Sequence, residues 1–178
     1  MRIALHSGLR IGEVNALRPE DIDFERNVIH VRSTITLDKE GKPYVKDGTK
    51  TENGIRDVPI SKALRPALEE ALAAAAAKPE NPYGVLFYST KRKTLITTTR
   101  VSMQYKRVLK EAGIEERGAH SLRHTFATRC IESGVPAVVL KNWLGHSDIH
   151  MTLDIYADVF KEMHNDAIEK LDRYMGRE

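Results

Sequence analysis

Cysteine is almost missing from this sequence, since Cys130 is the single one among 178 residues. A disulfide within the chain is therefore excluded, and a reducing compartment is expected. Long apolar runs are missing too, because no stretch approaches the roughly 18 residues of a membrane-spanning helix. The N-terminus also lacks the pattern of a secretory signal. These absences predict a cytoplasmic protein without a membrane segment, in which Cys130 is a buried structural thiol.

Motifs for metal ligation are scarce as well. There is no cysteine cluster, and the zinc-protease pattern His-Glu-x-x-His does not occur. Two histidine pairs, His120 with His124 and His146 with His150, are spaced four residues apart and would share a helical face. Without further ligands in the pattern, we expect no metal ion at either pair.

Length and charge are those of an ordinary globular domain. Lys and Arg number 28 against 25 Asp and Glu, which gives a net charge of +3, and 41% of the residues are hydrophobic. Such a chain is long enough for one domain with a substantial core. The mild basic excess is compatible with a nucleic-acid partner but does not establish one.

The local patterns predict an α+β fold that is mainly helical, with a small three-stranded antiparallel sheet near the N-terminus. β-branched residues indicate extended segments at 28–31, 34–37, 44–45 and 55–60, and residues 19–27 read as a polar link. Because the first helix starts without a cap, we expect preceding structure to be missing. The expected helices span residues 1–17 with a break at Gly8, 61–77 with Ser61 as N-cap, 97–112, 120–133, 136–144, 149–154 and 158–175.

The most informative stretch is residues 119–128. His120 and Arg123 lie three apart, so on a helix they share one face and converge on a single anion. The planar fork of an arginine suits phosphate oxygens, and a histidine moves a proton near neutral pH. The pair indicates chemistry at a phosphate, although a solvated helix face carries the same pattern more often.

Three earlier residues add charge. Gly8 breaks the first helix and places Arg10 at the start of the next, where free backbone amides also favour anions. Glu13, one turn later, is placed to orient an arginine through a bidentate pair. Lys50 stands in a turn from which a lysine can reach a leaving-group oxygen. Taken singly, each is more typical of ordinary surface charge.

Two later residues complete the set. Gly145 ends an apolar helix and leaves His146 at a helix junction. Tyr156 follows ten residues later. A phenol with a pKa near 10 needs cationic surroundings to act as a nucleophile. Alone, Tyr156 is more typical of a partly buried structural tyrosine.

Together and in this order, the segments resemble the catalytic domain of the tyrosine recombinases, the phage integrase family. The resemblance covers nearly the whole chain, and its details are most similar to integrases of phages and conjugative transposons. Family members carry a further helix before the first segment and an N-terminal domain that closes around DNA. We therefore expect residues 1–178 to be a catalytic domain without those parts, with 158–175 as a tail helix. The matching segments are Gly-Leu-Arg-Ile-Gly-Glu at 8–13, Thr-Lys-Thr at 49–51, Arg-Asp-Val-Pro-Ile at 56–60, His-Ser-Leu-Arg-His-Thr at 120–125, Leu-Gly-His-Ser at 144–147 and Thr-Leu-Asp-Ile-Tyr at 152–156.

The resemblance implies strand cleavage through a 3′-phosphotyrosine, with no nucleotide or metal cofactor. The two arginines would neutralise charge in the transition state, and the two histidines would hydrogen-bond the phosphate or assist proton transfer. The lysine would protonate the departing 5′ oxygen, and the tyrosine would attack phosphorus. The implied catalytic set is Arg10, Lys50, His120, Arg123, His146 and Tyr156, with Glu13 in support.

The resemblance also implies partners, namely double-stranded DNA and a homotetramer of the full-length protein on it. The tail carries an apolar stripe, and it would cover its own core or be exchanged between protomers. Two alternatives remain: a non-catalytic DNA-binding remnant and, less favoured, a type IB topoisomerase. Contacts to the DNA backbone, which set affinity and its salt dependence, are expected from Lys91, Arg92, Lys93, Arg100, Lys106 and Arg107.

Overall fold

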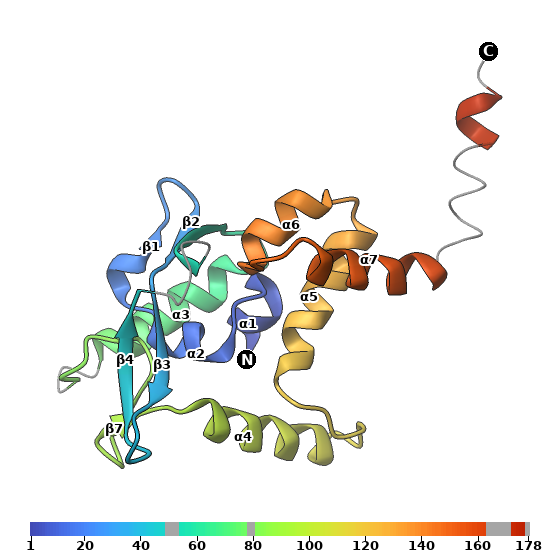
Figure 1. The fold of residues 1–178 in the computed structure, drawn as a ribbon. Coiled ribbons are helices and arrows are strands. Elements are labelled where there is room, and N and C mark those ends of the chain that lie inside the picture. Colours follow the sequence, from blue (N-terminus) through green and yellow to red (C-terminus); the bar gives the residue numbers. More distant parts are fainter. Residues whose placement is uncertain (49–53, 78–80, 163–171, 177–178) are drawn as a thin grey trace.

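The computed structural model describes residues 1–48, 54–77, 81–162 and 172–176 (Figure 1). The chain begins with two short helices, α1 (Arg2–Ser7) and α2 (Ile11–Ala16). Gly8 between them has a φ of 67°, a left-handed conformation that glycine adopts without steric cost. The break therefore occurs where the sequence predicts it, and Arg10 becomes the N-cap of α2.

The strands are short and antiparallel. The three-stranded sheet has the order β1-β2-β5, and β3–β4 and β6–β7 are separate two-stranded hairpins. Only Arg32 separates β2 from β3, so the chain passes there from one sheet to the next. The strands are β1 (Ile22–Asp23), β2 (Val28–Val31), β3 (Ser33–Leu37), β4 (Pro43–Asp47), β5 (Arg56–Pro59), β6 (Tyr88–Ser89) and β7 (Thr94–Leu95).

The mainly helical α+β class with a three-stranded antiparallel sheet is confirmed, but the membership of that sheet differs from the expectation. Residues 19–27, expected to be a link, contribute a 3-10 turn and strand β1. The segments expected at 34–37 and 44–45 pair only with each other. The burial pattern explains the division. Ile29 and Val31 pack into the core of the helices, whereas Ile35 packs into a smaller cluster with Val85 and Leu95.

Among the described residues, five helices of eight or more residues follow, and two of them depart from the expected bounds. Helix α3 begins at Arg65 because Ser61 accepts a hydrogen bond from Leu64 N–H in a turn that precedes it. Helix α7 continues through Tyr156 instead of breaking after residue 154, since no glycine or proline interrupts it. The helices are α3 (Arg65–Ala76), α4 (Thr98–Glu111), α5 (His120–Glu132), α6 (Ala137–Leu144) and α7 (His150–Glu162).

Only part of the expected tail stripe is described. Val159 is buried, Phe160 is exposed and Tyr174 is 77% exposed, so these three do not form one buried face. The expected stripe positions Met163, Ala167 and Leu171 lie outside the described residues.

Helix α5 contributes to two hydrophobic cores, and Figure 1 shows it next to α1, α6 and α7. The larger core joins α1, α2, α3 and the three-stranded sheet, and it receives Leu122 from the first turn of α5. The smaller core joins α5, α6 and α7 and contains Ala127, Ile131 and Leu140. Cys130 lies in this smaller core, where burial raises the pKa of its thiol to about 11, as suits an inert structural cysteine.

Within the described ranges, the helices are too short or too polar to cross a membrane.

The boundary between the two cores is the feature that organises the molecule. Helix α5 crosses it, and α6 ends beside it.

Candidate active site

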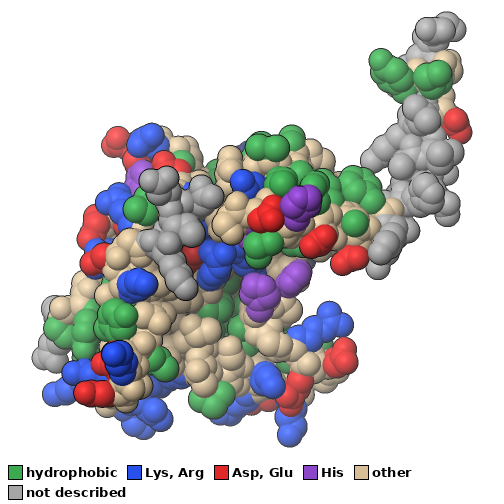
Figure 2. All heavy atoms as spheres, viewed as in Figure 1, with side chains coloured by type: hydrophobic (Ala, Val, Ile, Leu, Met, Phe, Trp, Pro, Cys, Tyr) green, Lys and Arg blue, Asp and Glu red, His purple; other side chains and the backbone are tan. Residues whose placement is uncertain are grey.

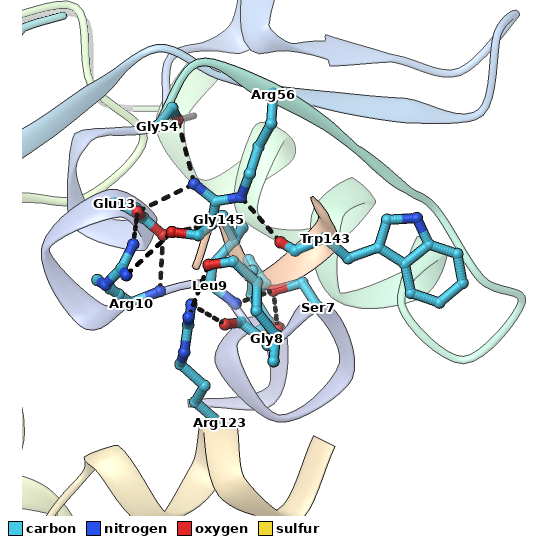
Figure 3. A network of polar contacts seen from close by, with 12 residues as sticks. Ser7, Gly8, Leu9, Arg10, Glu13, Gly54, Arg56, Arg123, Trp143 and Gly145 are labelled. Atoms are coloured by element: carbon cyan, nitrogen blue, oxygen red, sulfur yellow. Dashed lines mark hydrogen bonds and ion pairs between the residues drawn. The ribbon is translucent and has the colours of Figure 1, made fainter. Parts of the chain in front are cut away.

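Three arginines converge on the C-terminal end of helix α6. The last carbonyls of a helix have no partner within it and carry the negative end of the helix dipole, so cations suit them. The three come from the α2 N-cap, strand β5 and helix α5, and they fix the backbone that leads into His146 (Figure 3). The donor–acceptor pairs are Arg56 Nε to Trp143 O at 2.8 Å, Arg123 Nη2 to Leu144 O at 2.6 Å and Arg10 Nη2 to Gly145 O at 3.3 Å.

Glu13 lies between Arg10 and Arg56, and its side chain is only 4% exposed. Arg10 donates its backbone N–H and Nη1 to the carboxylate at 2.8 and 3.0 Å. Arg56 donates Nη2 and Nη1 at 2.8 and 3.1 Å. Burial alone would raise the pKa of Glu13, but these hydrogen bonds and charges outweigh it and hold the pKa below its ordinary value. Glu13 is therefore ionised at neutral pH.

Arg123 joins the two cores. Its guanidinium is buried and donates Nη1 to the carbonyl of Gly8 at 2.9 Å, in addition to its bond to Leu144. Burial, followed by the nearby charge of Arg10, lowers the pKa of Arg123 to about 9. Arg123 is still a cation at neutral pH, and a guanidinium has five N–H donors. Donors remain for an anion after both carbonyls are satisfied.

His146 comes directly after Gly145, at the end of α6, and is buried. Its Nδ1 lies 2.9 Å from Thr152 Oγ1, which leaves Nε2 for another partner. Burial and the charges of Arg123 and Arg10 lower the pKa of His146 to about 4. The imidazole is therefore neutral at pH 7, and its Nε2 either donates or accepts a hydrogen bond, depending on the tautomer.

The buried neutral state of His146 predicts a pH dependence of stability. The unfolded chain binds a proton at an ordinary pKa near 6.5, whereas the folded chain binds it near 4. The free energy of unfolding should therefore fall by about 2–3 kcal/mol as the pH drops from about 7 to about 4.5. Urea denaturation of the wild type and of His146→Gln checks this, because the variant should lack that part of the decline. Equal declines would contradict it.

His120 begins α5 and is exposed, with its ring 5.1 Å from that of His124. Partial desolvation, together with the charges of His124, Arg123 and Arg10, holds the pKa of His120 below its ordinary value. His120 is therefore also neutral at pH 7. Among the described residues, no three His, Cys, Asp or Glu side chains form a group that would hold a metal ion.

Two hollows share His120 and Arg123. One, of about 430 Å³, adds Arg10 from the α2 N-cap. The other, of about 220 Å³, adds His146 and residues of α7. Figure 2 shows histidines beside basic side chains on this face of the molecule. Four of the predicted catalytic residues thus line two hollows that share His120 and Arg123.

Tyr156 stands apart from this group. Its hydroxyl donates a hydrogen bond to the carbonyl of Val135, in the turn between α5 and α6. Its ring lies 5.7 Å from that of Phe160 and packs against the smaller core. Burial, with a smaller effect of Cys130, raises the pKa of Tyr156. The structure therefore does not bring the phenol oxygen to the two hollows, and Tyr156 is protonated in this arrangement.

The other predicted residues divide into separate groups. Lys50 lies outside the described residues. Lys91, Arg92 and Lys93 are exposed in the turn between β6 and β7. The three on α4 differ from one another. Arg100 lines a third cavity, to which α1 and α3 also contribute, and it donates to Ser89 at 3.4 Å. Lys106 forms an ion pair with Glu116, and Arg107 forms one with Glu111.

Arg56 is the residue of this network to which sequence reasoning assigns no role. Its signal is weak, because it is one more basic residue at the start of a short strand. It stands opposite the buried Val31 in the sheet, and this register turns a charged side chain toward the interior. The five-residue segment that it begins was nevertheless part of the resemblance.

Comparison with known proteins identifies the family. The model of the phage integrase family matches residues 1–163. The chain is 34% identical to a XerC-like tyrosine recombinase of Caldanaerobacter subterraneus, over 95% of this chain and 47% of that protein. It is 30% identical to the transposase of transposon Tn916 from Enterococcus faecalis, over 87% of this chain and 40% of the relative. The chain spans about half the length of the curated relatives it matches.

Solved structures show the same fold. The integrase of transposon Tn1549 in complex with circular intermediate DNA superposes with a TM-score of 0.79 at 28% identity, covering 96% of this chain and 58% of that one. The XerA recombinase superposes with a TM-score of 0.71 at 26% identity, covering 93% and 56%. The order of the motifs, the fold and the matched span of residues agree, and this chain belongs to the phage integrase family.

Proposed function

We propose that residues 1–178 form the catalytic domain of a site-specific DNA recombinase that cleaves and rejoins strands through a 3′-phosphotyrosine. The observation that carries this proposal is the convergence of Arg10 and Arg123 with two neutral histidines on adjoining hollows. In the pentacoordinate transition state, the phosphate gains negative charge on its non-bridging oxygens, and guanidinium donors fixed in place stabilise that charge most effectively. Both arginines are anchored, and the side chain of Arg10 is 44% exposed to receive a ligand.

Each bond that forms or breaks in this reaction is then assigned to a residue. The oxygen of Tyr156 attacks phosphorus, the bond from phosphorus to the 5′ oxygen breaks, and the strand is left joined to the enzyme. The phenol proton passes to neutral His120, and the departing 5′ oxygen takes a proton from Lys50. The new bond keeps the energy of the phosphodiester, so a 5′-hydroxyl reseals it without a nucleotide. Before attack, the phenol must leave the carbonyl of Val135 and move to the hollows.

The partners in this proposal are double-stranded DNA and further copies of the full-length protein. Solved structures of the Tn1549 integrase are complexes with transposon DNA, which supports the DNA partner. Exposed cations on the β6–β7 turn and α4 would contact the DNA backbone. The exposed apolar side chains of Phe160 and Tyr174 support a homotetramer on DNA in which the tail helix expected at 158–175 is exchanged between protomers.

A covalent-adduct assay tests the proposal. The purified 178-residue chain is mixed with a pool of nicked suicide duplexes whose bases around the nick are randomised, and detergent-resistant adducts are isolated. We expect an adduct that mass spectrometry places on Tyr156. Tyr156→Phe should form none, whereas Tyr174→Phe, which removes an exposed phenol outside the site, should form as much as the wild type. Binding of the duplexes without any wild-type adduct would favour the non-catalytic remnant. Relaxation of supercoiled plasmid that needs no particular sequence would favour the topoisomerase.

A further inference from the structure

Arg56 is a buried cation whose described hydrogen bonds all go to the protein. Its side chain is 6% exposed. Nε donates to the carbonyl of Trp143 at 2.8 Å, and Nη2 to Glu13 at 2.8 Å. Nη1 is shared between Glu13 at 3.1 Å and the carbonyl of Gly54 at 3.2 Å (Figure 3). Because Arg56 is enclosed in this way, any effect it has on a phosphate must pass through its neighbours.

We propose that Arg56 is a positioning residue for DNA cleavage, which holds both the Glu13 carboxylate that orients Arg10 and the end of α6 that carries His146. This inference rests on the proposed function. It adds a residue to which the reaction scheme assigns no step, and it gives that residue two separate routes to the phosphate.

The first route runs through Glu13. The fork of Arg56 takes one lone pair on each carboxylate oxygen, and Arg10 takes another on each through its backbone N–H and Nη1. A bidentate pair of this kind fixes the plane of the carboxylate. The side chain of Arg10 is nearly half exposed, and an exposed arginine samples many rotamers unless it is anchored. Arg56 therefore sets the geometry that Arg10 presents to a ligand.

The second route runs through the end of α6. Gly145 has a φ of 63° and leaves no space for a side chain, because a Cβ atom there would lie 2.9 Å from Cζ and from Nη1 of Arg56. The guanidinium therefore packs directly on the backbone of Gly145 while it holds the carbonyl of Trp143. His146 is the next residue. A change at Arg56 frees the last turn of α6 and moves the imidazole relative to Arg123.

The charges around Glu13 provide a test that distinguishes a positioning role of Arg56 from a purely structural one. Arg10 faces it from the α2 N-cap, Arg56 from β5 and Arg123 from α5, and Lys46 of β4 lines the same hollow as Glu13. Among these, Arg56 lowers the pKa of Glu13 most, against the opposing effect of burial. In Arg56→Gln, burial should raise that pKa. Protonated Glu13 no longer holds Arg10, so cleavage should slow as the pH falls.

The experiment compares single-turnover adduct formation by the full chain on a duplex selected from the pool. Arg56→Gln should cleave roughly 100-fold more slowly, the usual cost of misplacing a catalytic group by an ångström. The DNA concentration at half-saturation should not change, since exposed cations set the affinity. Glu13→Gln should be comparably slow but flat with pH. The double variant should be no slower than the slower single one and also flat, because the two residues act as a unit. Arg56→Lys should remove the acid dependence and restore part of the rate.

Arg65 offers the matched control. It is more exposed than Arg56, but it too donates to the protein, to the carbonyl of Phe24 at 3.3 Å and to Asn27 at 2.8 Å, and it lines neither hollow. Arg65→Gln should lower the melting temperature without changing the cleavage rate of folded protein or its pH profile. The proposal is overturned if Arg56→Gln behaves in the same way, or if the double variant regains the wild-type rate. If Arg56→Gln does not fold, the double variant, which carries no unpaired buried charge, and Arg56→Lys decide.

A measurement without DNA separates this proposal from the proposed function. Heteronuclear NOE values of the Arg10 Nε–H group report the order of its side chain. They should be high in the wild type and in Arg65→Gln, and clearly lower in Arg56→Gln. Unchanged values would contradict the positioning role even if the wild type cleaves DNA. Lowered values together with no wild-type adduct would contradict only the proposed reaction.

Discussion

Arg123→Lys is expected to cleave DNA in the assay above with a pH dependence that the wild type does not show. The surroundings of Arg123 lower its pKa from 12.5 to about 9, which leaves it charged at pH 7. The same surroundings would lower a lysine by a similar amount, from about 10.4 to near 7. Its cationic form is therefore lost as the pH rises through neutrality. At about pH 8 we expect cleavage to be 100- to 1,000-fold slower than in the wild type, the usual effect of losing one transition-state donor.

Single-turnover rates between about pH 6 and pH 8 check this expectation. Arg123→Met is the companion variant, because it fills a similar space without charge and should be inactive at every pH. It also leaves the carbonyls of Gly8 and Leu144 without their donor. Each carbonyl left without a donor lowers the free energy of unfolding by about 1–3 kcal/mol. Removal of the buried charge offsets part of that loss. Rates of Arg123→Lys that match the wild type across this range would contradict a need for the guanidinium charge.

The positions of these groups followed from the sequence where a local rule determined them. Gly8 needed a left-handed turn, so the break that places Arg10 at a helix N-terminus was predictable from the sequence alone. Gly145 likewise ends α6 in the left-handed conformation and leaves His146 at the junction. The spacing of His120 and Arg123 put both on one face of α5, and both line the same two hollows.

What the sequence did not predict depends on contacts between distant segments. Nothing local indicates that Arg56 and Glu13, 43 positions apart, form a buried pair, or that three arginines share the carbonyls at the end of α6. The hydroxyl of Tyr156 is a similar case. The sequence placed Tyr156 between two helices instead of on α7, and its partner is a carbonyl 21 residues earlier, which only the packing of α5, α6 and α7 brings close.

Gly8→Ala is expected to be the most destabilising of the small substitutions near the site. A Cβ atom at this position would lie 2.3 and 2.8 Å from two ring carbons of Phe126 and 3.0 Å from Leu144. Overpacking of this kind costs about 1–3 kcal/mol, and the left-handed backbone adds about 1–2 kcal/mol for any residue with a Cβ. We therefore expect a loss of about 2–5 kcal/mol in the free energy of unfolding, measured by urea denaturation.

Gly134→Ala separates the two causes. Gly134 has a φ of 82°, but among the described residues beyond its chain neighbours no atom would lie within 4 Å of a Cβ atom there. It should lose only the backbone part, about 1–2 kcal/mol. Adding Phe126→Ala should recover some of the overlap cost in Gly8→Ala and none in Gly134→Ala. Because the carbonyl of Gly8 accepts from Arg123, Gly8→Ala should also slow cleavage at temperatures where it is folded, whereas Gly134→Ala should not. Equal losses in the free energy of unfolding for the two alanine variants would show that the ring of Phe126 yields. Equal cleavage rates would show that Arg123 does not depend on this contact.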